Sequence, residues 1–134
     1  QAFLALVLRA AFGDEDDAYA RQALGALGQS EVIVPAIWPL EVANALAVAE
    51  RRKRLKPAEV TRFISLLQAL EITVDAATSS RAFEETLALA RRHTISAYDA
   101  AYLELAMRER AALATIDDAM RKVASRLGVA VFRA

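Results

Sequence analysis

The alternation of short apolar runs with longer segments of helical periodicity is the feature that most narrows the folds open to this chain. The runs are rich in β-branched and aliphatic residues: Val32–Val34, Ile72–Val74, Leu113–Thr115 and Val129–Phe132. Each is too short for a helix and is continuously apolar, as strands buried on both faces of a parallel sheet tend to be. The pattern predicts an α/β fold whose mainly parallel sheet is covered by helices on both faces.

Between these runs the apolar residues recur with the period of an amphipathic helix. Four such segments lie around Val42–Ala49, Val60–Leu67, Phe83–Ala90 and Met120–Leu127. Ala100–Ala106 is apolar almost all round, which predicts a helix in the interior. Ala2–Leu8 is also interpreted as an apolar helix, and no strand precedes it, so we expect the first strand of the sheet to be missing from this chain.

Length and composition limit the class of protein. The 134 residues fit one domain, which we take to span residues 1–134. No apolar run reaches the roughly 18 residues of a membrane span, because Arg9 interrupts the first one. There is no cysteine, which excludes disulfides and thiolate metal sites. Arg9 and the acids of residues 14–17 also argue against a signal peptide, so the sequence predicts a cytoplasmic protein.

Charge bears on the possible partners. The chain has 17 basic and 17 acidic side chains, so its formal net charge is zero. A protein that binds nucleic acid through charge alone is normally basic. A nucleic-acid partner would therefore have to be held by a local basic patch or by bound cations.

Three acidic residues follow predicted strands or begin predicted helices: Glu41, Asp99 and Asp117. Ligands of open α/β sheets bind beyond the carboxyl ends of the strands, where helix N-termini also point, so we expect these carboxylates to converge there. Carboxylates grouped in this way repel one another unless a cation lies between them. Mg²⁺ and Mn²⁺ prefer oxygen ligands and could activate a water for attack on a phosphodiester.

Each acid also has a purely structural interpretation. Asp99 stands three residues after Ser96, which is the spacing of a capping box. Asp117 fits an N-cap before the helix Ala119–Leu127, and Glu41 fits the positive end of its own helix. On the residues alone, both interpretations stay open for each acid.

Three segments around these acids resemble the motifs of PIN-domain ribonucleases, in particular the VapC-type toxins. The segments are Val34–Leu46, Ser96–Ala106 and Leu113–Asp117, and their order and spacing match the family over essentially the whole chain. The resemblance implies a three-layer α/β/α fold and Mg²⁺- or Mn²⁺-dependent cleavage of RNA, with Glu41, Asp99 and Asp117 as the catalytic metal ligands. It also implies a homodimer and inhibition by a small antitoxin protein.

Further residues near the motifs are candidates for supporting roles. Thr115 matches a hydroxyl position near the metal in the family, and Asn44 matches a polar residue beside the motif glutamate. Asp118 directly follows Asp117 and could assist the metal site. Glu104 is interpreted as a residue that helps orient the site or faces solvent, and Asp75 as a turn or cap residue.

Basic residues cluster at the end of the helix that begins near Glu41, in the run Arg51-Arg52-Lys53-Arg54. They suit the negative end of the helix dipole. Arg51, Arg52 and Arg54 are also candidates for contacts with RNA phosphates. Both interpretations stay open.

The start of the chain departs from the family. Members open with a strand that ends in Asp-x-Ser or Asp-x-Thr, and on that alignment Gln1 takes the Ser/Thr position, so the first metal-binding aspartate is absent from this sequence. The first hypothesis is an RNA-cutting toxin, and the second is a PIN-like module that has lost its first acid and binds RNA or an antitoxin without cleaving. A phosphate-transfer domain of the receiver type has less support, because only Lys122 could supply its lysine.

Overall fold

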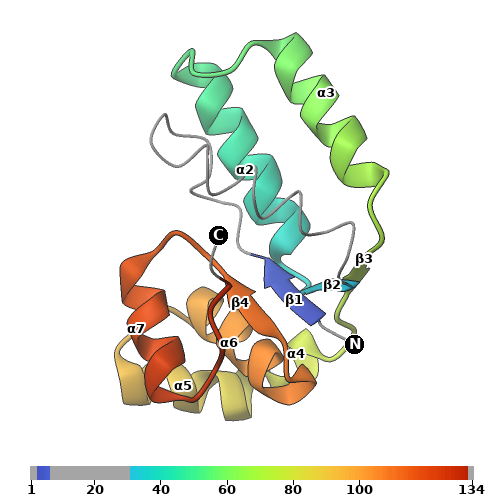
Figure 1. The fold of residues 1–134 in the computed structure, drawn as a ribbon. Coiled ribbons are helices and arrows are strands. Elements are labelled where there is room, and N and C mark those ends of the chain that lie inside the picture. The colour runs from blue at the N-terminus through green and yellow to red at the C-terminus, as the bar shows by residue number, and fades with distance from the viewer. Residues whose placement is uncertain (1–2, 7–30, 133–134) are drawn as a thin grey trace.

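The computed structural model describes residues 3–6 and 31–132, and the described strands form one parallel sheet. The strands are β1 (Phe3–Leu6), β2 (Glu31–Val34), β3 (Ile72–Val74) and β4 (Ala112–Ala114), in the order β3-β2-β1-β4. β1 pairs with both β2 and β4, and β2 also pairs with β3 (Figure 1). The predicted α/β fold with a parallel sheet is confirmed.

The central strand β1 corrects the prediction for the start of the chain. The sequence pattern predicts that Phe3–Leu6 is part of a helix and that the first strand is missing, whereas this segment is the strand between β2 and β4. A continuously apolar segment satisfies the helical and the strand pattern alike. Because β1 lies between two strands, the backbone groups on both of its sides find hydrogen-bonding partners. The same position buries Ala5 completely. Residues 1–2 and 7–8 lie outside the described residues.

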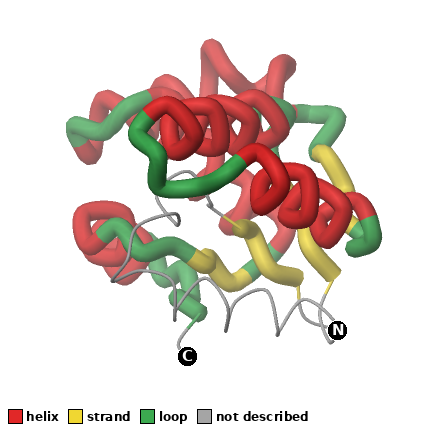
Figure 2. The backbone as a smooth tube through the Cα atoms, turned by 90° about the horizontal axis from the view of Figure 1, so that it is seen from above, coloured by secondary structure: helices red, strands yellow, loops and turns green. Residues whose placement is uncertain are grey.

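Helices cover the sheet from both sides, which agrees with a three-layer arrangement (Figure 1). α2 (Trp38–Arg51) and α3 (Pro57–Gln68) form an antiparallel pair that projects from one side of the sheet. α5 (Leu87–His93), α6 (Ala97–Glu109) and α7 (Asp118–Arg126) gather on the other side. In the view from above, α2, α3 and the turn that joins them lie nearest the viewer (Figure 2).

A π-helical turn interrupts the helical segment before α6. The short α4 (Thr78–Arg81) runs into the π-helix η1 (Ala82–Thr86), which continues into α5. The periodicity predicts that Phe83 shares a buried face with Leu87, but Phe83 is 90% exposed. Phe83 lies within this π-helical turn, whose hydrogen bonds close over five residues, so its position is out of phase with Leu87 in the α-helix that follows. The prediction for Phe83 is therefore wrong.

The end of the chain forms less of a strand than its composition predicts. Instead of a strand over Val129–Phe132, there is one isolated parallel bridge between Leu113 and Val131. The Leu113 amide donates to the Ala130 carbonyl over 2.8 Å, and the Phe132 amide donates to the Leu113 carbonyl over 2.8 Å. Among the helices within the described ranges, none combines the length and apolarity that crossing a bilayer requires.

α6 is the interior helix that the sequence predicts. Every residue from Ala100 to Ala106 is buried, and the helix packs against β1, β4 and α5. Tyr102, Leu103 and Leu105 are completely inaccessible to solvent. α6 is therefore the element around which the core is assembled.

The burial of Leu103 predicts a large effect on stability. We expect Leu103→Ala to lower the free energy of unfolding by about 2–5 kcal/mol, because it removes buried methyl groups and leaves a cavity. Leu40→Ala, at a side chain that is 75% exposed, should change it by less than about 0.5 kcal/mol. Urea denaturation of both variants measures the difference, and equal effects would show that α6 is not packed as described.

Candidate acidic site at the sheet edge

Glu41 lies in the first turn of α2, directly beyond the carboxyl end of β2. The loop Pro35-Ala36-Ile37 joins the two elements, and Pro39 stands in the first turn, where its missing amide hydrogen costs no helical bond. The Glu41 amide donates to the Ile37 carbonyl over 3.0 Å, so the residue is fixed within the helix. Glu41 as a whole residue is half-buried.

Tyr102 connects Glu41 to α6. The Tyr102 hydroxyl donates a hydrogen bond of 2.5 Å to Glu41 Oε1. Tyr102 follows Asp99 by one helical turn, so the two side chains lie on the same side of α6. The structure therefore brings together the first turns of α2 and α6, which carry Glu41 and Asp99. Sequence reasoning missed Tyr102, although a phenol in a helix predicted to be interior must find a polar partner.

Of the capping box predicted for Ser96 and Asp99, the half that Ser96 supplies is confirmed. Ser96 is the N-cap of α6, and its hydroxyl oxygen accepts a hydrogen bond of 3.0 Å from the Asp99 amide. That bond involves the backbone nitrogen of Asp99 and not its side chain. The cap fixes the first turn of α6, and the half-buried Asp99 carboxylate is positioned with it.

Asp117 is the N-cap of α7, as its structural interpretation predicts. Its Oδ1 accepts hydrogen bonds from the amides of Ala119 (2.8 Å) and Met120 (3.2 Å). The Asp117 amide donates to the hydroxyl of Thr115 over 3.1 Å, and Thr115 is only 1% exposed. Asp117 Oδ2 accepts no hydrogen bond from the rest of the described chain. One carboxylate can thus cap the helix and still present an oxygen to a ligand.

The three acids are not equally close to one another. Glu41 follows β2 and Asp117 follows β4, with β1 between them; neighbouring strands are about 4.8 Å apart, so the two strand ends are separated by about 10 Å. Within residues 3–6 and 31–132, no three acidic, histidine or cysteine side chains are grouped closely enough to hold a metal ion. After β1 the sequence has no acid before Asp14, which lies outside the described residues.

The chemistry of these donors fits a hard divalent cation. Mg²⁺ is usually bound through one or two protein carboxylates, with waters completing its octahedron. Glu41 and Asp99 supply a pair of carboxylates from facing helix turns, and Asp117 supplies a further oxygen along the same edge. Participation of all three in one site stays a prediction.

The remaining predicted residues lie around this edge or at a distance from it. Asn44 is exposed on α2, one turn after Glu41. Asp118 is 87% exposed in its side chain and pairs with Arg121 over 3.6 Å. The basic cluster, Arg51, Arg52 and Arg54, is exposed at the turn between α2 and α3. A rise of about 1.5 Å per residue puts Arg51 about 15 Å along the helix from Glu41.

A buried ion network adjoins the acidic site and was missed by the sequence analysis. Arg108 forms bidentate contacts with Asp75, at 2.7 and 3.1 Å, and contacts both carboxylate oxygens of Glu104 at 2.9 Å. Arg81 adds a contact of 3.3 Å with Glu104. Glu104 is only 6% exposed, so the suggestion that it faces solvent is wrong. Asp75 does form a turn, since it accepts from the Ala77 amide, but it is also an ion-pair partner.

The network shifts the titration of its members. Hydrogen bonds from Arg108 hold the pKa of the Asp75 carboxyl below its usual value of 3.8, although burial acts in the opposite direction. The hydrogen bonds that Arg108 donates, first to Glu104 and then to Asp75, raise the pKa of its guanidinium. Both effects favour the charged pair in the folded state.

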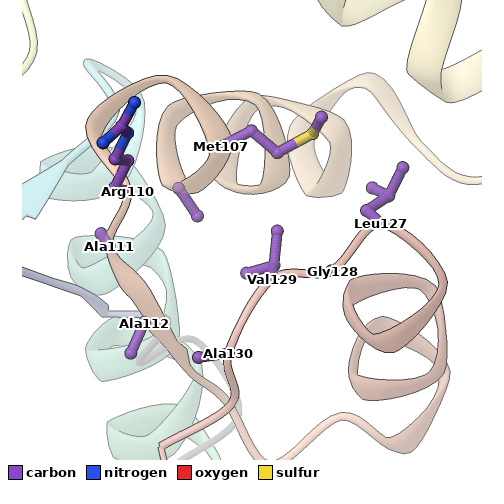
Figure 3. Close-up of a pocket in the computed structure, with 9 residues that line it drawn as sticks. Met107, Arg110, Ala111, Ala112, Leu127, Gly128, Val129 and Ala130 are labelled. Atoms are coloured by element: carbon purple, nitrogen blue, oxygen red, sulfur yellow. The ribbon is translucent and has the colours of Figure 1, made fainter.

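A different pocket, shown in Figure 3, lies away from the acids. It has a volume of about 460 Å³ and lies between the end of α6, the start of β4 and the segment after α7. Among the described residues, Met107, Leu127 and Val129 line it, and Arg110 is the charged one. Since β4 begins here, the pocket is at the amino edge of the sheet. It cannot be the site that the carboxylates form.

Comparison with known proteins assigns the family. The model of the PIN domain family matches residues 2–126, so the chain belongs to the PIN domain family, whose members are generally nucleases. The fold is similar to the crystal structure of PAE2754 from Pyrobaculum aerophilum, with a TM-score of 0.67 at 19% identity, over 91% of this chain and 79% of that one. No curated protein sequence matches the chain.

Substitution of Asp117 separates its capping role from any role in ligand binding. We expect Asp117→Ala to lower the free energy of unfolding by about 0.5–2 kcal/mol, because two amide donors of α7 lose their acceptor. Asp117→Asn should keep nearly all of the stability, since asparagine is an equally good N-cap, while removing the negative charge. Thermal unfolding of the two variants checks this, and equal losses would contradict the cap.

Titration of Asp75 predicts a pH dependence of stability. Because its pKa is lowered in the folded state, its carboxylate stabilises the protein above pH 3.8, and this contribution is lost as the pH falls further. We expect Asp75→Asn to be less stable than the wild type at pH 7 and to approach it as the pH falls toward 2. Urea unfolding from pH 7 to pH 2 measures this, with the exposed Glu71→Gln as control. A constant difference across that range would refute the ion pair.

Proposed function

We propose that this PIN domain is a Mg²⁺- or Mn²⁺-dependent endoribonuclease that acts as the toxin of a toxin–antitoxin pair. The main support is the hydrogen bond from Tyr102 to Glu41, because it holds the first turn of α6 against the first turn of α2. Carboxylates from two separate motifs, Glu41 and Asp99, are thereby presented at one edge of the sheet. The toxin role is supported by the resemblance of the three motifs to VapC-type toxins.

The proposed roles of the residues follow from their contacts. A bound divalent ion would polarise the phosphodiester and lower the pKa of a water. Glu41, fixed through Oε1 by Tyr102, and Asp99, fixed by the cap of α6, would hold that ion. Asp117 would contribute through Oδ2 while Oδ1 caps α7. Thr115 would keep Asp117 in place by accepting from its amide.

Contacts with RNA have to come from a local patch, since the net charge is zero. The exposed basic cluster of Arg51, Arg52 and Arg54 is the proposed patch for phosphate contacts. Because it lies at the far end of the helix that carries Glu41, a single strand running along α2 would meet both. A homodimer, an antitoxin partner and a cytoplasmic location belong to the same proposal.

A second function is favoured by a separate observation. In the part of the chain that the structure describes, no three acids gather into a metal site, and the sequence from Leu6 to Gly13 contains no acid. A PIN-like module that binds RNA or an antitoxin without cleaving would need no such site. Binding without cleavage is therefore the alternative that an experiment has to distinguish.

Cleavage of a labelled single-stranded RNA by the purified chain tests the proposal. We expect cleavage with Mg²⁺ or Mn²⁺ and none in excess chelator. Glu41→Gln and Asp99→Asn should each lower kcat by about 100-fold or more, the scale on which the loss of one preorganised electrostatic group acts. Glu84→Gln, which neutralises an exposed carboxylate on η1, should keep the wild-type rate.

The outcomes separate the two functions. Activity that persists in chelator, or that survives both substitutions, would reject the metal-dependent mechanism at this site. Binding of RNA by the wild type without any cleavage would instead support the second function. Circular dichroism of each variant controls for the fold.

A further inference from the structure

The ion network and the acidic site belong to one closed ring of contacts. We propose that Arg108 is a positioning residue for the acidic site, because it fixes the rotation of α6 that places Asp99 and Tyr102 beside Glu41. The effect on catalysis rests on the proposed function, whereas the effect on α6 does not. The ring runs from Glu41 through Tyr102 and along α6 to Arg108, then through Asp75 to the loop that leads back to α2.

The Arg108 end of the ring is rigid and buried. One guanidinium binds two carboxylates, Asp75 and Glu104, through four hydrogen bonds of 2.7–3.1 Å. The side chains of both acids are 7% exposed, and that of Arg108 is 18% exposed. Charge-assisted, forked bonds of this kind fix direction as well as distance.

Asp75 connects this network to the loop that starts α2. Its amide donates to the Val34 carbonyl at the end of β2 over 2.7 Å. Its Oδ2 accepts from the Thr78 hydroxyl over 3.1 Å, and the same hydroxyl oxygen accepts from the Ala36 amide over 3.0 Å. Ala36 belongs to the loop before α2, so Asp75 is fixed to the segment that determines where Glu41 lies.

The two anchors of α6 lie on different sides of the helix. Tyr102 and Arg108 are six positions apart, which at about 100° per residue puts them about 120° apart around the axis. Contacts in two such directions oppose rotation of the helix, whereas one contact alone would act as a pivot. Asp99 lies on the side of Tyr102, and its direction therefore depends on that rotation.

The packing of apolar side chains alone does not determine the rotation of α6 about its axis. Ala100–Ala106 is buried throughout and is apolar on nearly all sides, so its apolar side chains suit more than one setting. Within that stretch the polar side chains are Tyr102 and Glu104. Each must face its partner, because a buried polar group without one is costly. Polar anchors to other elements therefore define the setting: Tyr102 is bound to Glu41, and Arg108 is bound to Asp75.

Hydrogen–deuterium exchange of the full chain tests this inference without relying on activity. Arg108→Lys keeps the positive charge but loses the fork, and exposed Arg91→Lys on α5 is the matched control. We expect exchange at the start of α6, residues 97–103, to rise about tenfold in Arg108→Lys through local opening. Exchange of β2 and α7 should stay unchanged, as should the control variant throughout.

Enzyme kinetics and a second variant extend the test. Arg108→Lys should lower kcat for RNA about tenfold with KM changed less than about twofold, the signature of misplaced catalytic groups. Asp75→Asn breaks the ring on the other side and should reproduce both effects if Arg108→Lys fails to fold. The double variant should be no worse than either single one, because both remove the same connection.

Clear results would overturn the inference. Exchange that rises only around residues 104–110, rises everywhere, or rises equally in Arg91→Lys would reduce Arg108 to a local or general stabilising residue. Additive effects in the double variant would show that Arg108 and Asp75 act independently and not through one ring of contacts. If exchange at residues 97–103 rises in Arg108→Lys but the wild type cuts no RNA, the positioning of α6 by Arg108 would be supported and the proposed function would be rejected.

Discussion

The structure depends on the burial of the middle of one helix, α6, on all its sides. Ala100–Ala106 is buried throughout and α6 packs against β1, β4, η1 and α5, so Tyr102, Glu104 and the largely buried Arg108 need partners inside the protein. Two of these partners lie far away in the sequence: Glu41 for Tyr102 and Asp75 for Arg108. The requirement to satisfy buried polar atoms thus determines which loops meet at the carboxyl edge of the sheet.

The candidate site is built from groups that serve the fold and could also serve chemistry. Asp117 caps α7 and keeps a second oxygen, and Glu41 accepts from a buried phenol while remaining at the edge of the sheet. When each acid is considered singly, a structural role and a catalytic role look like alternatives. The contacts show that one carboxylate can serve both. Helix starts at a parallel sheet edge favour both, because amide donors and ligand sites occur together there.

Much of this fold could be predicted from local patterns. The helix around Val60–Leu67 is present as α3, the interior helix around Ala100–Ala106 is present as α6, and β2 and β3 lie where the apolar runs predict them. Phe3–Leu6 could not be assigned, since an all-apolar segment has no period and its neighbours β2 and β4 decide its conformation. The prediction that Phe83 is buried is wrong because a π-helical turn shifts the phase of the apolar pattern without changing the composition.

The site was only partly predictable for a similar reason. Glu41, Asp99 and Asp117 stand at recognisable positions after strands and at helix starts. Tyr102 and Arg108 act through contacts with Glu41 and Asp75, which lie 61 and 33 positions away, and no spacing rule encodes such contacts. Interior charges are also rare in proteins, so the sequence pattern does not predict that Glu104 is buried in an ion network.

The shape of α2 has a consequence for anything that binds along it. It is one uninterrupted helix from Trp38 to Arg51, with Glu41 near its base and basic residues at its tip. Its hydrogen-bonded backbone cannot stretch, so the interval between the negative and the positive end is constant. α2 therefore holds Glu41 and the basic residues at a fixed separation. A polymer that contacts both ends of the helix must carry charges that match them at that separation.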